Sequence, residues 1–220
     1  YIVNETAVKL LAQTLKQVNP NGVFIHYSTD YVFDGTKTEP YSETDATNPQ
    51  SIYGKSKLAG EHALIDSGIS HLIFRTSWVY SLFGKNFVNT IKRLPVERTE
   101  LTIVSDQLGA PTSALEIATV TLLAIKHLQM TPIQTAHSIC GIYNLTGKEM
   151  LSWYEFAQKI VAQMNLDSPP EIKPQLTKDY PFKAPRPLNS RLSGAHIKIL
   201  TGSHHACFFS PLRLRHPPNA

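Results

Sequence analysis

Two alternating apolar patterns predict an α/β protein with a mostly parallel sheet. Short runs of apolar and β-branched residues are separated by longer segments in which apolar residues recur every three or four positions. Strands that alternate with helices form βαβ units, whose strands run parallel. The chain has 220 residues, 42% of them hydrophobic and 17% charged, which is the composition of a globular protein large enough to bury a core.

The first part of the chain opens inside a helical pattern. Apolar residues recur at helical spacing from Val3 to Val18, and Asn19-Pro20-Asn21-Gly22 ends that helix. The apolar and aromatic run from Gly22 to Ser28 predicts a buried strand. A loop rich in Thr, Pro and Asp then covers residues 34–50, and helical spacing returns from Ile52 to Leu64, with Gly68 as its stop.

The second part repeats the alternation, and its last residues break it. In order, the patterns predict a strand over 71–76, a helix over 87–94, a strand over 101–104, a helix over 117–128, a strand over 142–145 and a helix over 153–164. Apolar periodicity ends near Leu192, so residues 193–220 are expected to be an irregular, non-native tail. His204, His205 and Cys207 lie close together in that tail, but no other ligand completes a metal site.

Charge and cysteine content narrow the class of protein. The net charge is +4, yet six basic residues and no acidic one follow Asp179, so a basic tail follows a mildly acidic body. That distribution does not favour a nucleic-acid partner. No apolar run is long enough to cross a membrane. Cys140 and Cys207 are the only cysteines, which fits a reducing compartment, and we expect a cytoplasmic protein.

Tyr53 and Lys57 carry the most informative spacing in the chain. Four residues apart, they share one face of the helix that begins there. A free phenol, with a pKa of about 10, is a weak acid–base catalyst at neutral pH, and a nearby ammonium group lowers that pKa. The same spacing also arises on the solvated face of ordinary helices, so the pair alone does not decide between the two interpretations.

Polar residues follow both neighbouring strands. Ser28, Thr29 and Asp30 end the first strand, and Arg75-Thr76-Ser77-Trp78 ends the next. Open α/β sheets bind ligands at the carboxyl ends of their strands. Thr29 is placed to hydrogen-bond either a substrate carbonyl or the Tyr53 phenol, although a threonine there also serves to cap the turn.

In order along the chain, five motifs resemble those of the extended short-chain dehydrogenase/reductases, and within them the dTDP-4-dehydrorhamnose reductase family. They are STDYVFDG at 28–35, YGKSKLAGE at 53–61, RTSWVY at 75–80, DQLGAPT at 106–112 and RPLNS at 186–190. The resemblance runs from about Tyr1 to Leu192. It implies a partial Rossmann-type, doubly wound parallel sheet in residues 1–80, completed by about 115–146. A smaller, C-terminal substrate-binding region is implied in residues 81–114 and 147–192.

The resemblance also implies a reaction and residue roles. NADPH or NADH would reduce the C4 ketone of a dTDP-linked 4-keto-6-deoxy sugar, with Tyr53 protonating the alkoxide. Lys57 would lower the pKa of Tyr53 and hold the nicotinamide ribose, with Ser28 also at the cofactor. Thr29 would act beside Tyr53. The residues that contact the substrate would be Thr29, Asp30, Trp78 and Arg186. The planar guanidinium of Arg186 suits a diphosphate, although the alternative is an ordinary surface arginine.

One departure from the family's pattern limits these expectations. None of the 11 glycines forms the glycine-rich dinucleotide turn, so we expect the chain to be an N-terminally truncated reductase. Two other readings stay open: a non-catalytic relative acting as a regulatory subunit, and an epimerase or dehydratase acting on another nucleotide sugar. The choice between NADPH and NADH, a Mg²⁺ requirement and a homodimer leave no readable signature in the sequence.

Overall fold

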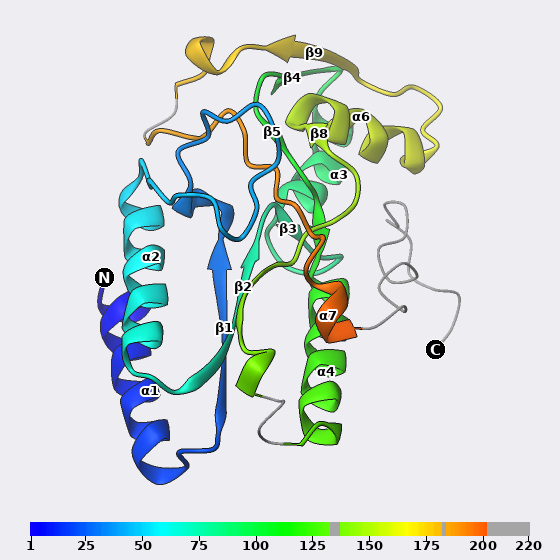
Figure 1. The fold of residues 1–220 in the computed structure, drawn as a ribbon. Helices are drawn as coiled ribbons and strands as arrows, with labels where there is room; N and C mark the ends of the chain where they lie inside the picture. Colours follow the sequence, from blue (N-terminus) through cyan, green and yellow to red (C-terminus); the bar gives the residue numbers. More distant parts are fainter. Residues whose placement is uncertain (133–136, 182–183, 202–220) are drawn as a thin grey trace.

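A three-stranded parallel sheet lies at the centre of the computed structural model, which describes residues 1–132, 137–181 and 184–201. Its strands are β1 (Val23–Thr29), β2 (Ser70–Thr76) and β7 (Gly141–Asn144), in the order β1-β2-β7. The pairing aligns the carboxyl ends of β1 and β2, with Thr29 opposite Thr76. Helices lie on both faces of the sheet (Figure 1), so the predicted α/β class with a doubly wound parallel sheet is confirmed.

Alternate residues of the strands pack against the two helical layers. On one face, Ile73 packs with α1 (Ala7–Val18), which continues the π-helical turn η1 (Ile2–Thr6), and with α2 (Ile52–Asp66). On the other, Leu72 and Phe74 pack with α4 (Ala114–Met130). This period-two alternation is what a strand buried between two layers requires.

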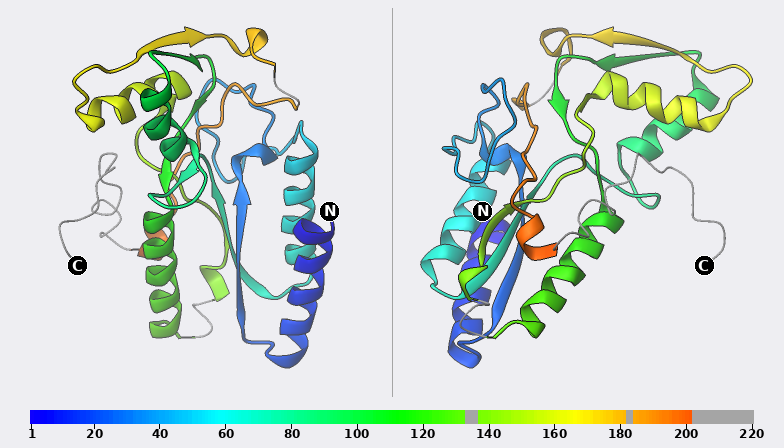
Figure 2. Two further views of the ribbon diagram at one scale, coloured as in Figure 1. Left: turned by 180° about the vertical axis from the view of Figure 1, so that it is seen from behind. Right: turned by 45° about the vertical axis from the view of Figure 1, so that its right-hand side comes forward.

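A second group of elements lies beyond the carboxyl ends of the strands (Figure 2). It consists of α3 (Phe87–Glu97), β4 (Glu100–Val104), α6 (Trp153–Met164) and β9 (Glu171–Gln175). β4 and β9 pair in parallel, and α3 and α6 share a separate apolar cluster centred on the fully buried Phe156. A capping box between Ser152 and Glu155 starts α6 at its expected first residue.

Several short elements were not expected from the sequence. Two-residue strands form the pairs β3 (Val79–Tyr80) with β6 (Thr112–Ser113) and β5 (Leu108–Gly109) with β8 (Leu151–Ser152). The turns η2 (Asp30–Val32) and η3 (Thr177–Asp179) are single 3₁₀ turns. Segments of two or three residues are too short to carry a periodic apolar pattern.

Part of the segment expected to be irregular is built into the fold. Residues 193–201 include the short helix α7 (Lys198–Thr201), and Ile197 and Leu200 are buried in the same cluster as α4. The structure therefore differs from the expectation for these nine residues. Residues 202–220, with His204, His205 and Cys207, lie outside the described residues.

Candidate active site

The carboxyl end of β1 gathers three buried polar side chains. Ser28 and Thr29 end the strand and Asp30 opens η2, and each is less than a tenth exposed. The Thr29 hydroxyl donates to Oδ1 of Asp30 at 2.8 Å and accepts the Tyr31 N–H at 3.3 Å. A hydroxyl has a single proton, and in this arrangement it lies in the bond to the Asp30 carboxylate, so it would have to turn to bond an ionised Tyr53.

Helix α2 brings Tyr53 to the same strand end. Ser51 caps the helix, its Oγ accepting the Gly54 N–H at 3.0 Å, which starts α2 just before Tyr53. Gly54 lies directly against the η2 turn, since a Cβ there would be 2.1 Å from the Tyr31 carbonyl oxygen. The Tyr53 ring, half exposed, meets Tyr31 edge to face with 6.0 Å between ring centroids. Hence a glycine at position 54 allows the phenol to reach the strand end.

Burial is the largest influence on the Tyr53 pKa and raises it. A hydrogen bond from the Thr29 hydroxyl to the ionised phenol acts in the opposite direction, and the Asp30 charge raises the pKa further. The sequence led us to expect a pKa lowered by Lys57. In the structure, the side chains that influence the Tyr53 pKa are Thr29 and Asp30, and Lys57 is not among them.

Lys57 instead faces the backbone of β1. Its ammonium donates to the Tyr27 carbonyl at 2.5 Å and lies 3.5 Å from Nε2 of His26. Burial and then Lys57 lower the pKa of His26 to about 4, so this imidazole is neutral at pH 7 and able to accept a hydrogen bond. Sequence reasoning missed His26; its only signal is that it alternates with Ile25 and Tyr27 on β1, on the side of α2.

Asp30 is the most perturbed carboxyl group of the site. Burial raises its pKa to about 6, although hydrogen bonds from Thr29 and Ser190 act in the opposite direction. Its second oxygen, Oδ2, is buried and has no hydrogen-bond partner among the described residues. Ser190 was also missed as a site residue, and its only signal was its place in the RPLNS motif. A carboxyl group thus titrates near neutrality beside the phenol.

Arg186 and Trp78 occupy different surroundings. Arg186 is exposed, and its charge lowers the pKa of Tyr31, whose ring contacts Tyr53; Arg186 therefore lies close to the site. Trp78 stacks on Trp153 with 3.6 Å between centroids, inside the apolar cluster of α3 and α6. Its backbone is left-handed, with φ of 46°, and Gly109 leaves room for its indole, since a Cβ there would lie 2.2 Å from the ring.

A buried ion pair fastens α2 to β2. Arg75 binds Glu61 through Nη2 at 2.6 Å and Nε at 3.1 Å, and both side chains are almost fully buried. Arg75 also donates to the Glu43 carbonyl at 3.3 Å. The expectation that the polar residues after the second strand share one crevice with Thr29 therefore does not hold for Arg75, which anchors the helix that carries Tyr53 and Lys57.

The residues present fit one end of a dinucleotide cofactor. Ser28 Oγ and Thr76 Oγ1 are buried without hydrogen-bond partners in the described part of the chain, at the paired ends of β1 and β2. Together with the Lys57 ammonium they suit the hydroxyl groups of a ribose. The pyrophosphate end has no counterpart, because no glycine-rich turn occurs among the chain's 11 glycines.

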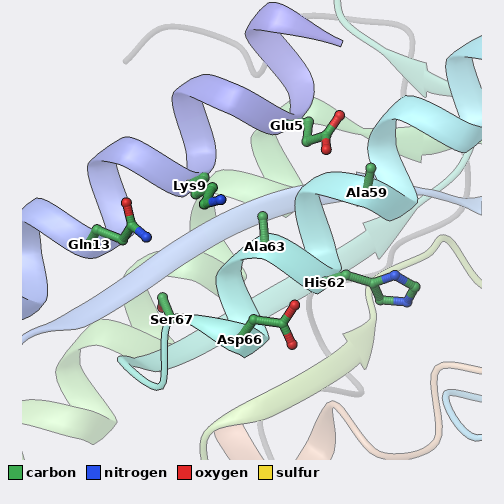
Figure 3. Close-up of a pocket in the computed structure, with 8 residues that line it drawn as sticks. All are labelled: Glu5, Lys9, Gln13, Ala59, His62, Ala63, Asp66 and Ser67. Carbon is green, nitrogen blue, oxygen red and sulfur yellow. The ribbon is translucent and has the colours of Figure 1, made fainter.

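A separate groove lies between α1 and α2, away from this strand end (Figure 3). It encloses about 320 Å³ and is lined mainly by polar and charged side chains, including Glu5, Lys9, His62 and Asp66. None of the residues assigned to the site lines it. In residues 1–132, 137–181 and 184–201, no helix could span a membrane and no cluster of His, Cys, Asp or Glu could hold a metal ion.

Comparison with known proteins agrees with this arrangement. A family model described as the RmlD substrate binding domain matches residues 1–212. A dTDP-4-dehydrorhamnose reductase of Burkholderia thailandensis is 45% identical over 90% of this chain and 67% of its own length. The dTDP-4-dehydrorhamnose reductase of Salmonella typhimurium is 42% identical over 87% of this chain and 63% of its own length. The chain thus spans about two thirds of the length of these relatives.

Solved structures give the same result. A dTDP-4-dehydrorhamnose reductase from Bacillus anthracis, in complex with NADP, superposes with a TM-score of 0.79 at 32% identity, covering 90% of this chain and 66% of that one. A dTDP-4-dehydrorhamnose reductase from Clostridium acetobutylicum superposes with a TM-score of 0.80 at 36% sequence identity, again covering 90% of this chain and 66% of that one. A UDP-glucuronic acid 4-epimerase from Bacillus cereus superposes with a TM-score of 0.70 at 21% sequence identity, covering 97% of this chain and 64% of that one. At that identity the likeness shows a shared fold alone.

A parallel sheet with helices on both faces, and a threonine, a tyrosine and a lysine at its carboxyl edge, define the class of extended short-chain dehydrogenase/reductases. Within that class, the chain belongs to the RmlD substrate binding domain family, whose curated members similar to it are named dTDP-4-dehydrorhamnose reductase.

Proposed function

We propose that this protein reduces the C4 ketone of dTDP-4-dehydro-6-deoxy-L-mannose to form dTDP-L-rhamnose, in the cytoplasm. One observation carries the proposal: Tyr53 and Thr29 meet at the end of β1, with Lys57 one helical turn further along α2. Bound NADPH or NADH supplies the hydride.

The chain's own residues would position the ketone and deliver a proton. Tyr53 would donate its phenolic proton to the alkoxide that forms at C4, because its raised pKa keeps it protonated near neutrality. Lys57 and Ser28 would hold the cofactor's ribose, Lys57 turning from the Tyr27 carbonyl that binds it now. Thr29, Asp30 and the exposed Arg186 would face the substrate, and Arg186 suits its diphosphate. Trp78, whose ring is held by stacking on Trp153, would line the edge of the sugar site.

The test follows NAD(P)H oxidation by this chain with the 4-keto sugar. We expect turnover that falls by about a factor of 10² to 10⁴ in the Tyr53→Phe variant, the range in which a general acid contributes. Tyr154→Phe is the matched control, because this phenol bonds Gln158 on α6, far from the strand end, and its loss should leave turnover unchanged.

Other outcomes separate the rival functions. An epimerase would convert a nucleotide sugar without net oxidation of cofactor, and a regulatory relative would bind a partner enzyme but convert nothing. Turnover that is equal in the wild type and in Tyr53→Phe would contradict the role given to the phenol.

A further inference from the structure

The motif DQLGAPT at 106–112 has no part in the reaction proposed above, but it contacts the residues that follow β2. The carbonyl of Ala110 accepts a hydrogen bond from the buried Ser77 hydroxyl at 3.1 Å, and the Thr112 N–H donates to the Trp78 carbonyl at 3.2 Å. From Thr112 onward, β6 pairs in parallel with β3. The motif is thus bound to Ser77 and Trp78, the two residues that lie between β2 and β3.

Trp78 is held in an uncommon conformation. Its φ of 46° falls in the left-handed region, which bulky aromatic residues rarely occupy. Its indole stacks on Trp153 with 3.6 Å between ring centroids and 11° between ring planes. A bulky residue keeps such a backbone conformation only where its surroundings fix it, and positions of this kind are concentrated at ligand sites. The surroundings of the Trp78 ring therefore bear on function.

Gly109 leaves the space that the indole occupies. A Cβ at this position would lie 2.2 Å from Cε2, 2.5 Å from Nε1 and 2.6 Å from Cζ2 of the Trp78 ring, well inside van der Waals contact. The backbone of Gly109 does not itself require a glycine, because its φ lies outside the left-handed region. The glycine is needed for the ring and not for the turn of the chain.

The main chain at Gly109 has little room to yield. Gly109 pairs with Leu151 in the antiparallel β5–β8 ladder, and the preceding Leu108 donates its N–H to the Leu188 carbonyl at 2.7 Å. The same ladder ends directly before Trp153, the first residue of α6, so it also sets where the stacking partner lies. A side chain added at position 109 therefore has to displace the indole.

We propose that Gly109 is a positioning residue: the space it leaves lets Trp153 and the DQLGAPT motif hold the Trp78 indole in one orientation at the edge of the sugar site. The consequence for the substrate rests on the function proposed above, in which Trp78 lines that site. The orientation of the ring is a property of this chain without cofactor or substrate.

Nuclear magnetic resonance tests the orientation of the ring. Trp78 and Trp153 are the only tryptophans of the chain, so one Trp153→Phe variant assigns their indole signals. We expect nuclear Overhauser contacts between the two indoles in the wild type and their loss in Gly109→Ala. Gly194→Ala is the matched control, because a Cβ there would meet its nearest neighbour at 3.6 Å, an ordinary contact. Contacts that persist in Gly109→Ala would overturn the proposal.

A second variant separates this contact from a general loss of folding. Trp78→Leu keeps an apolar side chain but lacks the three ring atoms that a Cβ at position 109 would strike. Gly109→Ala should lower the urea midpoint in the wild type and lower it much less in the Trp78→Leu background, because residues in contact have coupled effects. Equal shifts in the two backgrounds would place the effect of the alanine elsewhere, and the proposal would fail.

For the reaction, we expect a change in substrate binding and not in the chemical step. In the NAD(P)H oxidation assay, Gly109→Ala should raise the KM for the 4-keto sugar about tenfold, the lower end of what one misplaced methyl group costs in a binding pocket. Its kcat should stay close to that of the wild type, because a wall of the site contacts ground state and transition state alike. A fall in kcat at unchanged KM would contradict the assignment.

The measurements on the ring need no turnover. A chain that oxidises no NAD(P)H but loses the contacts between the indoles in Gly109→Ala would count against the proposed function and leave the positioning of Trp78 standing. Turnover that depends on Tyr53, with indole contacts that Gly109→Ala leaves intact, would do the reverse.

Discussion

Asp30 shows how a single residue of the site acts against the stability of the fold. Its pKa rises from 3.8 to about 6 on folding because the carboxyl group is buried. A raised pKa contributes stability below pH 3.8 that is lost as the pH rises through 6, since the folded chain then holds a buried charge. We expect Asp30→Asn to increase the free energy of unfolding at pH 8 by about 2–3 kcal/mol, and to change it little at pH 4.

Urea denaturation at the two pH values measures this difference. Asp34→Asn is the matched control, because hydrogen bonds from Thr36, Tyr41 and Asn48 lower the pKa of Asp34 to about 2. The same substitution there should decrease stability at pH 8. Equal effects of the two variants would contradict the physical explanation given for Asp30.

At the residue scale, the sequence predicted which candidate side chains lie near one another where these belong to contiguous motifs. Tyr53 and Lys57 share a helix, and Thr29 and Asp30 share a strand end, so local spacing was enough to bring each pair together. Ser190 and His26 depend on where distant segments fold, and no local pattern signals them. The direction of the Tyr53 pKa shift could not be predicted either, because it depends on burial, on the Thr29 hydroxyl and on the charge of Asp30, which only the folded chain brings together.

At the scale of elements, a buried ion pair attaches α2 to the sheet. Its Glu61 binds Arg75 of β2 by two nitrogen donors in a buried setting. Removing one partner leaves the other charge uncompensated, which typically costs 3–5 kcal/mol. We therefore expect Glu61→Gln to destabilise the chain by about 3–5 kcal/mol and to displace the helix that carries Tyr53 and Lys57.

Denaturation and the NAD(P)H oxidation assay described above would both report this loss. The exposed pair of Lys173 with Glu100, at 2.5 Å, gives the comparison. Breaking it by Glu100→Gln should cost far less stability than Glu61→Gln, because solvent screens an exposed pair. If the two variants were equally destabilising, burial would not be the reason for the strength of the α2 attachment.

Most of the longer elements were predictable because their apolar periods extend over several turns or residues, but the five-residue strand β9 was not expected. The helices and strands expected from the sequence are all present, with ends displaced by no more than three residues. α3, for instance, continues past Pro95 to Glu97. α7 was missed because its four residues become helical by packing Ile197 and Leu200 onto α4, a contact that only the folded chain provides.

On the scale of the whole molecule, the described residues form four apolar clusters. Two lie on the two faces of the central sheet, a third joins α3, α6 and both stacked tryptophans, and a fourth packs Val32, Phe33 and Tyr41 with Leu192. The site lies between them, at the carboxyl end of β1. The sequence led us to expect that residues 81–114 and 147–192 form a separate substrate-binding region, and whether this region unfolds independently can be tested by denaturation.

Phe156→Ala tests that independence. Phe156 is fully buried in the third cluster, and truncating such a ring costs about 3–5 kcal/mol. The chain's two tryptophans, Trp78 and Trp153, stack in that cluster, so their fluorescence reports on this region. Most helical residues belong to α1, α2 and α4 around the sheet, and far-UV circular dichroism is therefore weighted toward the other region.

We expect Phe156→Ala to lower the urea concentration at the midpoint of the fluorescence transition. The midpoint of the circular dichroism transition should change little. Leu72→Ala, in the cluster between the sheet and α4, is the reciprocal control and should act mainly on the dichroism. If both signals moved together in both variants, the two regions would unfold as one cooperative unit. The segment from Asn189 to Ile197, which hydrogen-bonds to both regions, would then connect them. The geometry of the site would in that case depend on the whole fold.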